Sequence, residues 1–148
     1  MGTGQTLLAL AAIVLLSIIT MSIRQMYVQS VNTTVDSQHT ADALNFGRDI
    51  SERIHTFSTR YFEFVDEFGD CNADTFDLDE VNQGCKFEMN SMAGEDYIAT
   101  LFVEGESDIH IGTAIQTGRV ITIRIFSERD DVSTFRAEYK TILANLTP

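Results

Sequence analysis

An uncharged apolar segment near the start of the chain constrains its fold more than any other feature. The segment runs from Leu7 to Ile23 with the sequence LLALAAIVLLSIITMSI, and no Asp, Glu, Lys or Arg precedes Arg24. As a helix it would be about 26 Å long at 1.5 Å per residue, slightly less than the roughly 30 Å hydrocarbon core of a bilayer. Because such a helix is apolar on every face, it must be buried all round, in lipid or in other protein.

Four interpretations of this segment compete. A cleaved secretory signal usually begins with basic residues, and residues 1–6 contain none. A buried helix of a globular domain needs to be wrapped completely, and the remaining chain is small for that. A simple membrane anchor fits the composition, but Arg24 would then place the following domain in the cytoplasm by the positive-inside tendency. In the fourth interpretation, dedicated processing handles a leader outside this numbering or a very short one, and the helix later packs among copies of itself.

The rest of the chain is strongly acidic. All ten bases and all twenty-two acids lie at or after Arg24, and the net charge of the 148 residues is −12. This charge repels phosphate backbones, so nucleic acid is not an expected partner, and it also repels anionic membrane surfaces. Ten Phe and four Tyr argue against intrinsic disorder. We therefore expect two parts, an apolar assembly or membrane helix over residues 1–30 and an acidic α+β domain over 31–148.

An amphipathic pattern follows the apolar segment. Apolar side chains recur near helical spacing at Met26, Tyr27, Val31 and Val35. Residues 32–34, Asn-Thr-Thr, are a poor helix interior, and Asp36 or Ser37 would make a reasonable new N-cap. We therefore expect a break or kink in the helix between about residues 32 and 38.

A second stripe of apolar residues has helical spacing. Its steps are 4, 4, 3, 4 and 3 residues, through Phe46, Ile50, Ile54, Phe57, Tyr61 and Phe64. The pattern predicts a helix packed on a sheet, and the alternative is an aromatic stripe that binds a partner.

Two cysteines, Cys71 and Cys85, follow this stripe. We predict a disulfide between them, since two sulfurs are too few for a metal site and two reduced thiols would need a cytoplasmic setting. Closing a loop of this size stabilises a protein by about 3 kcal/mol in the chain-entropy model. A disulfide in turn indicates an oxidising, extracytoplasmic location.

The segment around the cysteines is acidic, with eight acids between Glu63 and Glu80. Asp70, Asn72 and Asp74 have the alternate spacing of oxygen ligands in a calcium loop, and Asp77 and Asp79 would complete the set. The rest of that pattern is missing, because Thr75 replaces the turn glycine and the twelfth position is Val81. We interpret the segment as a solvated loop and assign no metal to it.

The C-terminal half has the pattern of strands and turns. Strands are expected over residues 86–90, 97–104, 109–116 and 119–127, with a tight turn at Thr117-Gly118 and with Ile121, Ile123 and Ile125 on one face. From Ser133, Phe135, Tyr139, Ile142, Leu143 and Leu146 have helical spacing, which predicts a closing helix. The expected fold is α+β, with a long N-terminal helix on an antiparallel β-meander.

The sequence contains no recognisable catalytic pattern. His39, His55 and His110 lie on different expected elements, with no ligand-pair spacing. A nucleophile elbow, a Walker loop and a dinucleotide fingerprint are all absent from the sequence. We expect no enzyme activity, no cofactor and no small-molecule substrate, and we interpret His110 as a surface or interface residue.

The layout as a whole resembles that of a type IV pilin or pseudopilin. The resemblance rests on the short polar start, the uncharged apolar helix, its amphipathic continuation and the C-terminal sheet domain. Members of that family carry Glu at the fifth position of the mature chain, where it is thought to neutralise a neighbouring subunit's terminal amine. Here that position is Gln5 if Met1 is the mature start, or Ala9 if processing falls between Gly4 and Gln5. Gln can hydrogen-bond an amine but cannot neutralise it.

The resemblance implies a subunit that polymerises with copies of itself into an extracellular helical filament, after residing in the membrane, with a methylated N-terminus. The assembly helix would bury Gln5, Leu7, Leu8, Leu10, Ile13, Val14, Leu15, Leu16, Ile18, Ile19, Met21 and Ile23. The alternative is a single-span, membrane-anchored extracytoplasmic binding or sensory domain, including a minor pseudopilin.

Overall fold

The computed structural model describes residues 2–91, 94–130 and 132–146 and has an α+β fold. The chain divides into two compact units, residues 1–38 and 39–148. Helix α1 spans Gly2–His55, so residues 2–38 form a single helical segment and the rest of α1 belongs to the second unit.

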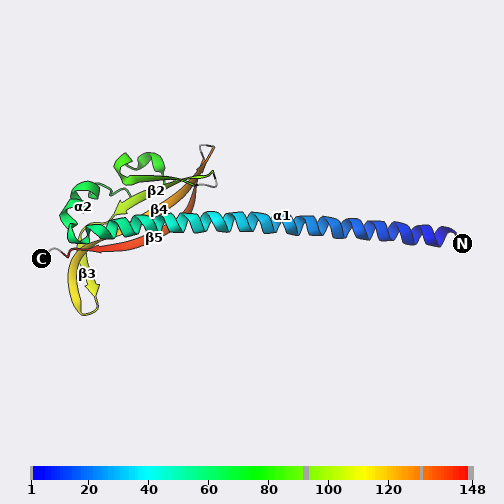
Figure 1. Cartoon of the computed structure of the whole chain (residues 1–148), viewed down its shortest axis with the longest axis horizontal. Coiled ribbons are helices and arrows are strands. Elements are labelled where there is room, and N and C mark those ends of the chain that lie inside the picture. Colours follow the sequence, from blue (N-terminus) through cyan, green and yellow to red (C-terminus); the bar gives the residue numbers. More distant parts are fainter. Residues whose placement is uncertain (1, 92–93, 131, 147–148) are drawn as a thin grey trace. The chain divides into compact units, whose positions relative to one another are not determined.

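The second unit contains the remaining elements (Figure 1). A 3-10 helix at Thr56–Thr59 leads into α2, Tyr61–Phe68, and two more 3-10 turns follow at Leu78–Glu80 and Gln83–Cys85. The strands are β1 Lys86–Asn90, β2 Asp96–Val103, β3 Ser107–Ile111, β4 Ala114–Arg129 and β5 Val132–Ala144.

The five strands form one antiparallel sheet around β4. Residues 121–128 of β4 pair with β2 and residues 114–118 pair with β3, so β2 and β3 lie one after the other along the same edge of β4. Strand β5 pairs along the other edge, and β1 lies outside β2. The antiparallel sheet is as expected, but the strand order is not a simple meander, because β2 skips β3 to pair with β4.

The core lies between the helices and one face of this sheet. The second apolar stripe is confirmed as a helix-on-sheet contact: Phe46, Ile50, Ile54, Tyr61 and Phe64 are buried, and Phe57 packs against them. From the sheet, Ile121, Ile123 and Ile125 are each 0% exposed, which confirms their common inward face. The 3-10 helix divides the stripe between α1 and α2, where one helix was expected.

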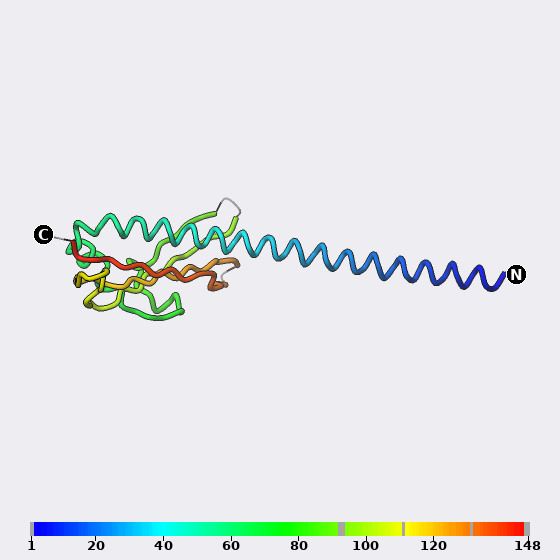
Figure 2. Tube along the Cα trace, turned by 90° about the horizontal axis from the view of Figure 1, so that it is seen from below, coloured from blue at the N-terminus to red at the C-terminus, as the bar shows by residue number. Residues whose placement is uncertain are grey.

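The opposite face of the sheet is covered by the disulfide-closed segment, residues 71–85. Figure 2 shows the C-terminal part of α1 and this segment on opposite faces of the sheet. Thr122, Arg124 and Phe126 of β4 are 8% exposed or less. Because both faces of β4 are covered, every residue from 121 to 127 is buried.

The expected helix break at residues 32–38 is absent, because α1 continues to His55. The hydroxyl groups of Thr33 and Thr34 donate to the backbone carbonyls of Gln29 and Ser30, at 2.9 and 2.8 Å. A threonine that bonds the carbonyl four residues back stays inside a helix instead of ending it.

The expected closing helix after Ser133 is also wrong, because these residues form β5. The apolar residues with helical spacing lie on both sides of the strand. Phe135 and Ile142 are 45% and 47% exposed. Ala137, Thr141 and Leu143 are buried, and the even spacing between them is that of one face of a strand. Pairing with residues 118–129 of β4 decides the structure here over the 3.6-residue pattern.

The turn expected at Thr117-Gly118 lies instead at Gly112-Thr113, and the strand expected over 109–116 is split by it. Gly112 has a φ of +63°, which suits a two-residue hairpin turn. Gly118 lies within β4 and pairs with Ser107 on one side and Ala144 on the other. A Cβ there would lie 2.5 Å from the carbonyl oxygen of Leu143, so this glycine marks a close approach of two backbones.

Candidate functional site

The apolar part of α1 is exposed on every side in the single chain. The large apolar side chains of residues 7–23 are between 51% and 74% exposed. They comprise Leu7, Leu8, Leu10, Ile13, Val14, Leu15, Leu16, Ile18, Ile19, Met21 and Ile23. Gln5 lies in the same helix and is also exposed. All the assembly-helix positions singled out from the sequence therefore lie on one exposed helical surface.

This helix is long and apolar enough to cross a membrane. Its most apolar window has a mean hydropathy of 2.5, and none of that window is buried within the chain. It is therefore not wrapped as the core helix of the domain. A membrane anchor and an N-terminal signal both have these properties.

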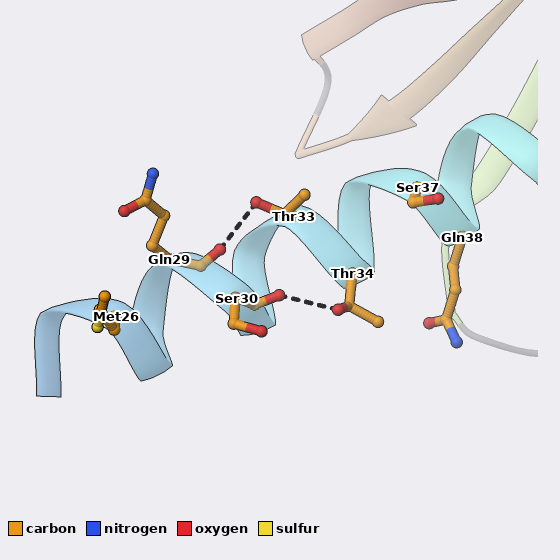
Figure 3. A pocket seen from close by; sticks show the side chains of 7 residues that line it. All are labelled: Met26, Gln29, Ser30, Thr33, Thr34, Ser37 and Gln38. Atoms are coloured by element: carbon orange, nitrogen blue, oxygen red, sulfur yellow. Dashed lines mark hydrogen bonds between the residues drawn. The ribbon is translucent and has the colours of Figure 1, made fainter. Parts of the chain in front are cut away.

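Polar groups within the helix are satisfied locally. The hydroxyls of Ser17, Thr20 and Ser22 each donate to the carbonyl four residues back, at 2.7 to 2.9 Å. Figure 3 shows the continuation of this pattern, where the hydroxyls of Thr33 and Thr34 donate to the backbone carbonyls of Gln29 and Ser30. Because these hydroxyls need no outside donor or acceptor, the helix can enter an apolar environment at low cost.

Charge is almost absent from residues 2–38, which contain one base, Arg24, and one acid, Asp36. Both are exposed. The side chains three or four residues from Arg24 are Thr20, Met21, Tyr27 and Val28, so no acid lies next to it on its own helix.

The predicted disulfide is present in the second unit. Cys71 and Cys85 are joined with a Cα–Cα distance of 5.6 Å, and both are buried in the core. The backbone carbonyl of Cys71 accepts a hydrogen bond from the Val103 amide at 2.7 Å, which fixes the start of the segment to the end of β2.

The weak calcium candidates Asp70, Asn72 and Asp74 are not brought together as ligands. Asp74 forms an ion pair with Arg124, and the Asp77 carboxylate accepts a hydrogen bond from the Asp79 amide at 3.0 Å. In the described parts of the chain, no group of three or more His, Cys, Asp or Glu side chains is placed to hold a metal ion.

Sequence reasoning missed the role of Arg124. Its guanidinium contacts Asp74 and Glu138 and donates to the Thr75 carbonyl, and it lies 4.3 Å from the centre of the Phe76 ring. The available signal was one base in the middle of an otherwise apolar strand pattern, RVITIRIFS. An isolated charge at such a position implies a partner from another segment.

A second polar cluster joins α1 to β2 at the start of the second unit. His39 Nδ1 lies 3.0 Å from the Tyr97 hydroxyl. The same nitrogen lies 3.0 Å from Glu95 Oε2, which is within ion-pair distance. Among the described residues, Glu95 Oε2 accepts no hydrogen bond of good geometry. Burial, followed by the charges of Glu95 and Asp42, raises the pKa of Tyr97, while Arg136 opposes the shift.

The other two histidines lie apart from this cluster. His55 Nε2 is 2.9 Å from the Thr141 hydroxyl, and His110 is exposed in β3, which agrees with its interpretation as a surface residue.

The arrangement is a long apolar helix whose C-terminal part packs on an antiparallel sheet, a layout compatible with a pilin-like fold. Comparison with protein-family models, with curated proteins and with solved structures finds no match to this chain.

Proposed function

We propose that this chain is a structural subunit of an extracellular, pilus-like helical filament of the type IV pilin kind. One observation carries the proposal: the apolar side chains of residues 7–23 are more than half exposed, on a helix attached to a domain that has its own core. A surface of this size and character needs a permanent apolar environment.

Copies of the same helix can provide that environment. Before assembly the segment lies in a bilayer, and on assembly it exchanges lipid for identical neighbours with little loss of burial. Contacts that use two different surfaces of the subunit and do not close into a ring generate an open helical polymer. In this mechanism the protein catalyses no reaction, and the acidic domain forms the outer surface.

The disulfide supports an extracytoplasmic position for the domain. Disulfides persist in oxidising compartments and are rare in the cytosol. The bond between Cys71 and Cys85 closes the segment that covers the outer face of the sheet.

Electron microscopy of material sheared from producing cells tests the proposal. We expect filaments that contain this chain, identified by labelling with an antibody raised against the domain. Recovery of the chain only in the detergent-solubilised membrane fraction, with no filaments, would overturn the proposal. Mass spectrometry of the N-terminal peptide would separately distinguish Met1 from Gln5 as the mature start.

A second candidate function is a single-span, membrane-anchored domain that binds or senses outside the cytoplasm, including a minor pseudopilin. The two candidates for the fifth mature position, Gln5 and Ala9, favour it, because neither side chain can neutralise a neighbour's terminal amine. A membrane-anchored domain would share every feature with a filament subunit except repeated packing of the helix against its own copies. The same fractionation therefore distinguishes the two functions, because the anchored domain would be recovered in the membrane fraction and not in sheared filaments.

A further inference from the structure

We propose that, in the filament, Arg24 of one copy pairs with Asp36 of a neighbouring copy and thereby fixes the axial offset between the two helices. The inference rests on the proposed filament and specifies the contact that sets its register. The offset is twelve residues, or about 18 Å at 1.5 Å per residue.

The first argument is the position of Arg24 at the end of the apolar surface. It is exposed and has Met21, Ile23 and Val28 around it, with exposures of 67%, 61% and 55%. When copies cover these side chains, they also surround the guanidinium. A charge buried without a partner is strongly destabilising, so Arg24 needs an acid from a neighbour.

The second argument is the choice of acid. An in-register bundle would place Arg24 beside Arg24, which is repulsive. Towards the N-terminus the described helix contains no acid, and in the other direction Asp36 is the first one. The next acid, Asp42, belongs to the unit that contains the sheet. Asp36 is therefore the one acid in the described part of the N-terminal helical unit.

The third argument is independent of charge and concerns the other side chains at the same heights. With an offset of twelve residues, most apolar residues between positions 14 and 24 are level with apolar ones, such as Leu16 with Val28, Ile19 with Val31 and Ile23 with Val35. The exceptions are Ile18, level with Ser30, and Met21, level with Thr33. Polar residues are level with polar ones: Ser17 with Gln29, Thr20 with Asn32 and Ser22 with Thr34.

Neighbouring offsets place more apolar residues level with polar ones. An offset of thirteen residues places Ile19 level with Asn32 and Ile23 level with Asp36, and an offset of eleven places Arg24 level with Val35. Because a polar group facing an apolar layer is unfavourable, the offset of twelve, which has the fewest such mismatches of the three, is preferred by both the charge and the apolar pattern.

Such a contact also explains open growth. Each copy offers Arg24 to one neighbour and Asp36 to another, so the two surfaces differ and the contact continues along the polymer without closing.

A charge exchange in the full-length chain tests the pair. We expect Arg24→Asp alone and Asp36→Arg alone each to lower the yield of sheared filaments by about tenfold or more, since each leaves like charges together. The double variant, Arg24→Asp with Asp36→Arg, should restore filaments. The matched control is an exposed ion pair in the same helix, Arg48 and Glu52, whose Nε and Oε1 atoms lie 3.7 Å apart. The single changes Arg48→Glu and Glu52→Arg should leave the filament yield unaltered.

Cysteine crosslinking gives a second readout. The variant Arg24→Cys, Asp36→Cys should form a ladder of disulfide-linked oligomers in the filaments, whereas either single variant should stay monomeric. Dimers from the Arg24→Cys variant alone would indicate an in-register bundle and overturn the inference.

The outcomes separate this inference from the proposed function. If the wild-type chain forms filaments but the exchange does not rescue the single variants, the Arg24–Asp36 contact is wrong and the filament proposal stands. If the wild-type chain forms no filaments, the proposed function is wrong and the inference falls with it.

Discussion

Arg124 in the centre of the sheet is hydrogen-bonded to Asp74 in the disulfide-closed segment, fifty residues earlier in the chain. The same guanidinium donates from Nε to Glu138 Oε2 at 3.2 Å and from Nη1 to the Thr75 carbonyl at 3.2 Å. Its side chain is only 10% exposed, while that of Asp74 is 59% exposed. One side chain therefore links β4, β5 and the segment that covers them.

Replacing this residue should destabilise the domain. We expect Arg124→Met to lower the free energy of unfolding by about 1 to 3 kcal/mol, because it removes several hydrogen bonds to charged or carbonyl groups and the contact with Phe76. Asp74→Asn should cost less than about 1 kcal/mol, since that carboxylate is well solvated. Urea unfolding of the full-length chain in detergent measures both. Equal losses would show that the Asp74 bond, and not the whole set of contacts, supplies the stabilisation.

Gly118 should be more sensitive to substitution than Gly112. In Gly118→Ala the new methyl group meets the Leu143 carbonyl oxygen and the end of the Ile109 side chain, each at 2.5 Å, so backbone must move. We expect a loss of about 1 to 3 kcal/mol, typical of overpacking.

Gly112→Ala is the matched control, because no atom lies within 4 Å of its new Cβ and only the positive φ is unfavourable. Its loss should be about 1 kcal/mol or less. Thermal unfolding of both variants in the same detergent makes the comparison, and a larger loss for Gly112→Ala would contradict the close approach inferred at Gly118.

Alkaline pH should weaken the domain through its buried tyrosines. Burial raises the pKa of Tyr97 and of Tyr61 above the ordinary value of 10.0, so both neutral phenols are favoured in the folded state. The resulting stabilisation is complete below about pH 10 and is lost as the pH rises through the folded-state pKa values.

A phenylalanine variant isolates this effect. The free energy of unfolding should decline less between about pH 9 and about pH 11 in Tyr97→Phe than in the wild type, because the phenol no longer titrates. The two proteins declining in parallel would show that other groups cause the alkaline loss.

The sequence was sufficient wherever one local pattern decided the structure. The period-two run at Ile121, Ile123 and Ile125, the helical stripe from Phe46 to Phe64 and the pair of cysteines each had one dominant physical solution. The α+β class and the disulfide were predicted correctly for that reason.

The errors arose where contacts distant in sequence decided between two local solutions. Residues 132–144 fit a helix by spacing, and their pairing with β4 makes them a strand. Gly118 resembles a turn residue locally, but it is required by the close approach of the β5 backbone and of the Ile109 side chain. Arg124 finds its partner Asp74 fifty residues away, and no local pattern in the sequence connects them.

Assembly of the proposed filament should strengthen as ionic strength rises. Arg24 and Asp36 cancel, so the net charge of −12 belongs to residues 39–148, and crowded copies of that domain repel one another. The Debye length falls from about 30 Å at 0.01 M to about 8 Å at 0.15 M salt, which screens exposed charges far more than a buried ion pair. The sedimentable fraction of the chain, measured across this range, should therefore increase. Neutralising the exposed acids Asp66, Glu67 and Asp70 to their amides should flatten the dependence. A sedimentable fraction that stays constant or falls with salt would show that repulsion between domains does not limit assembly.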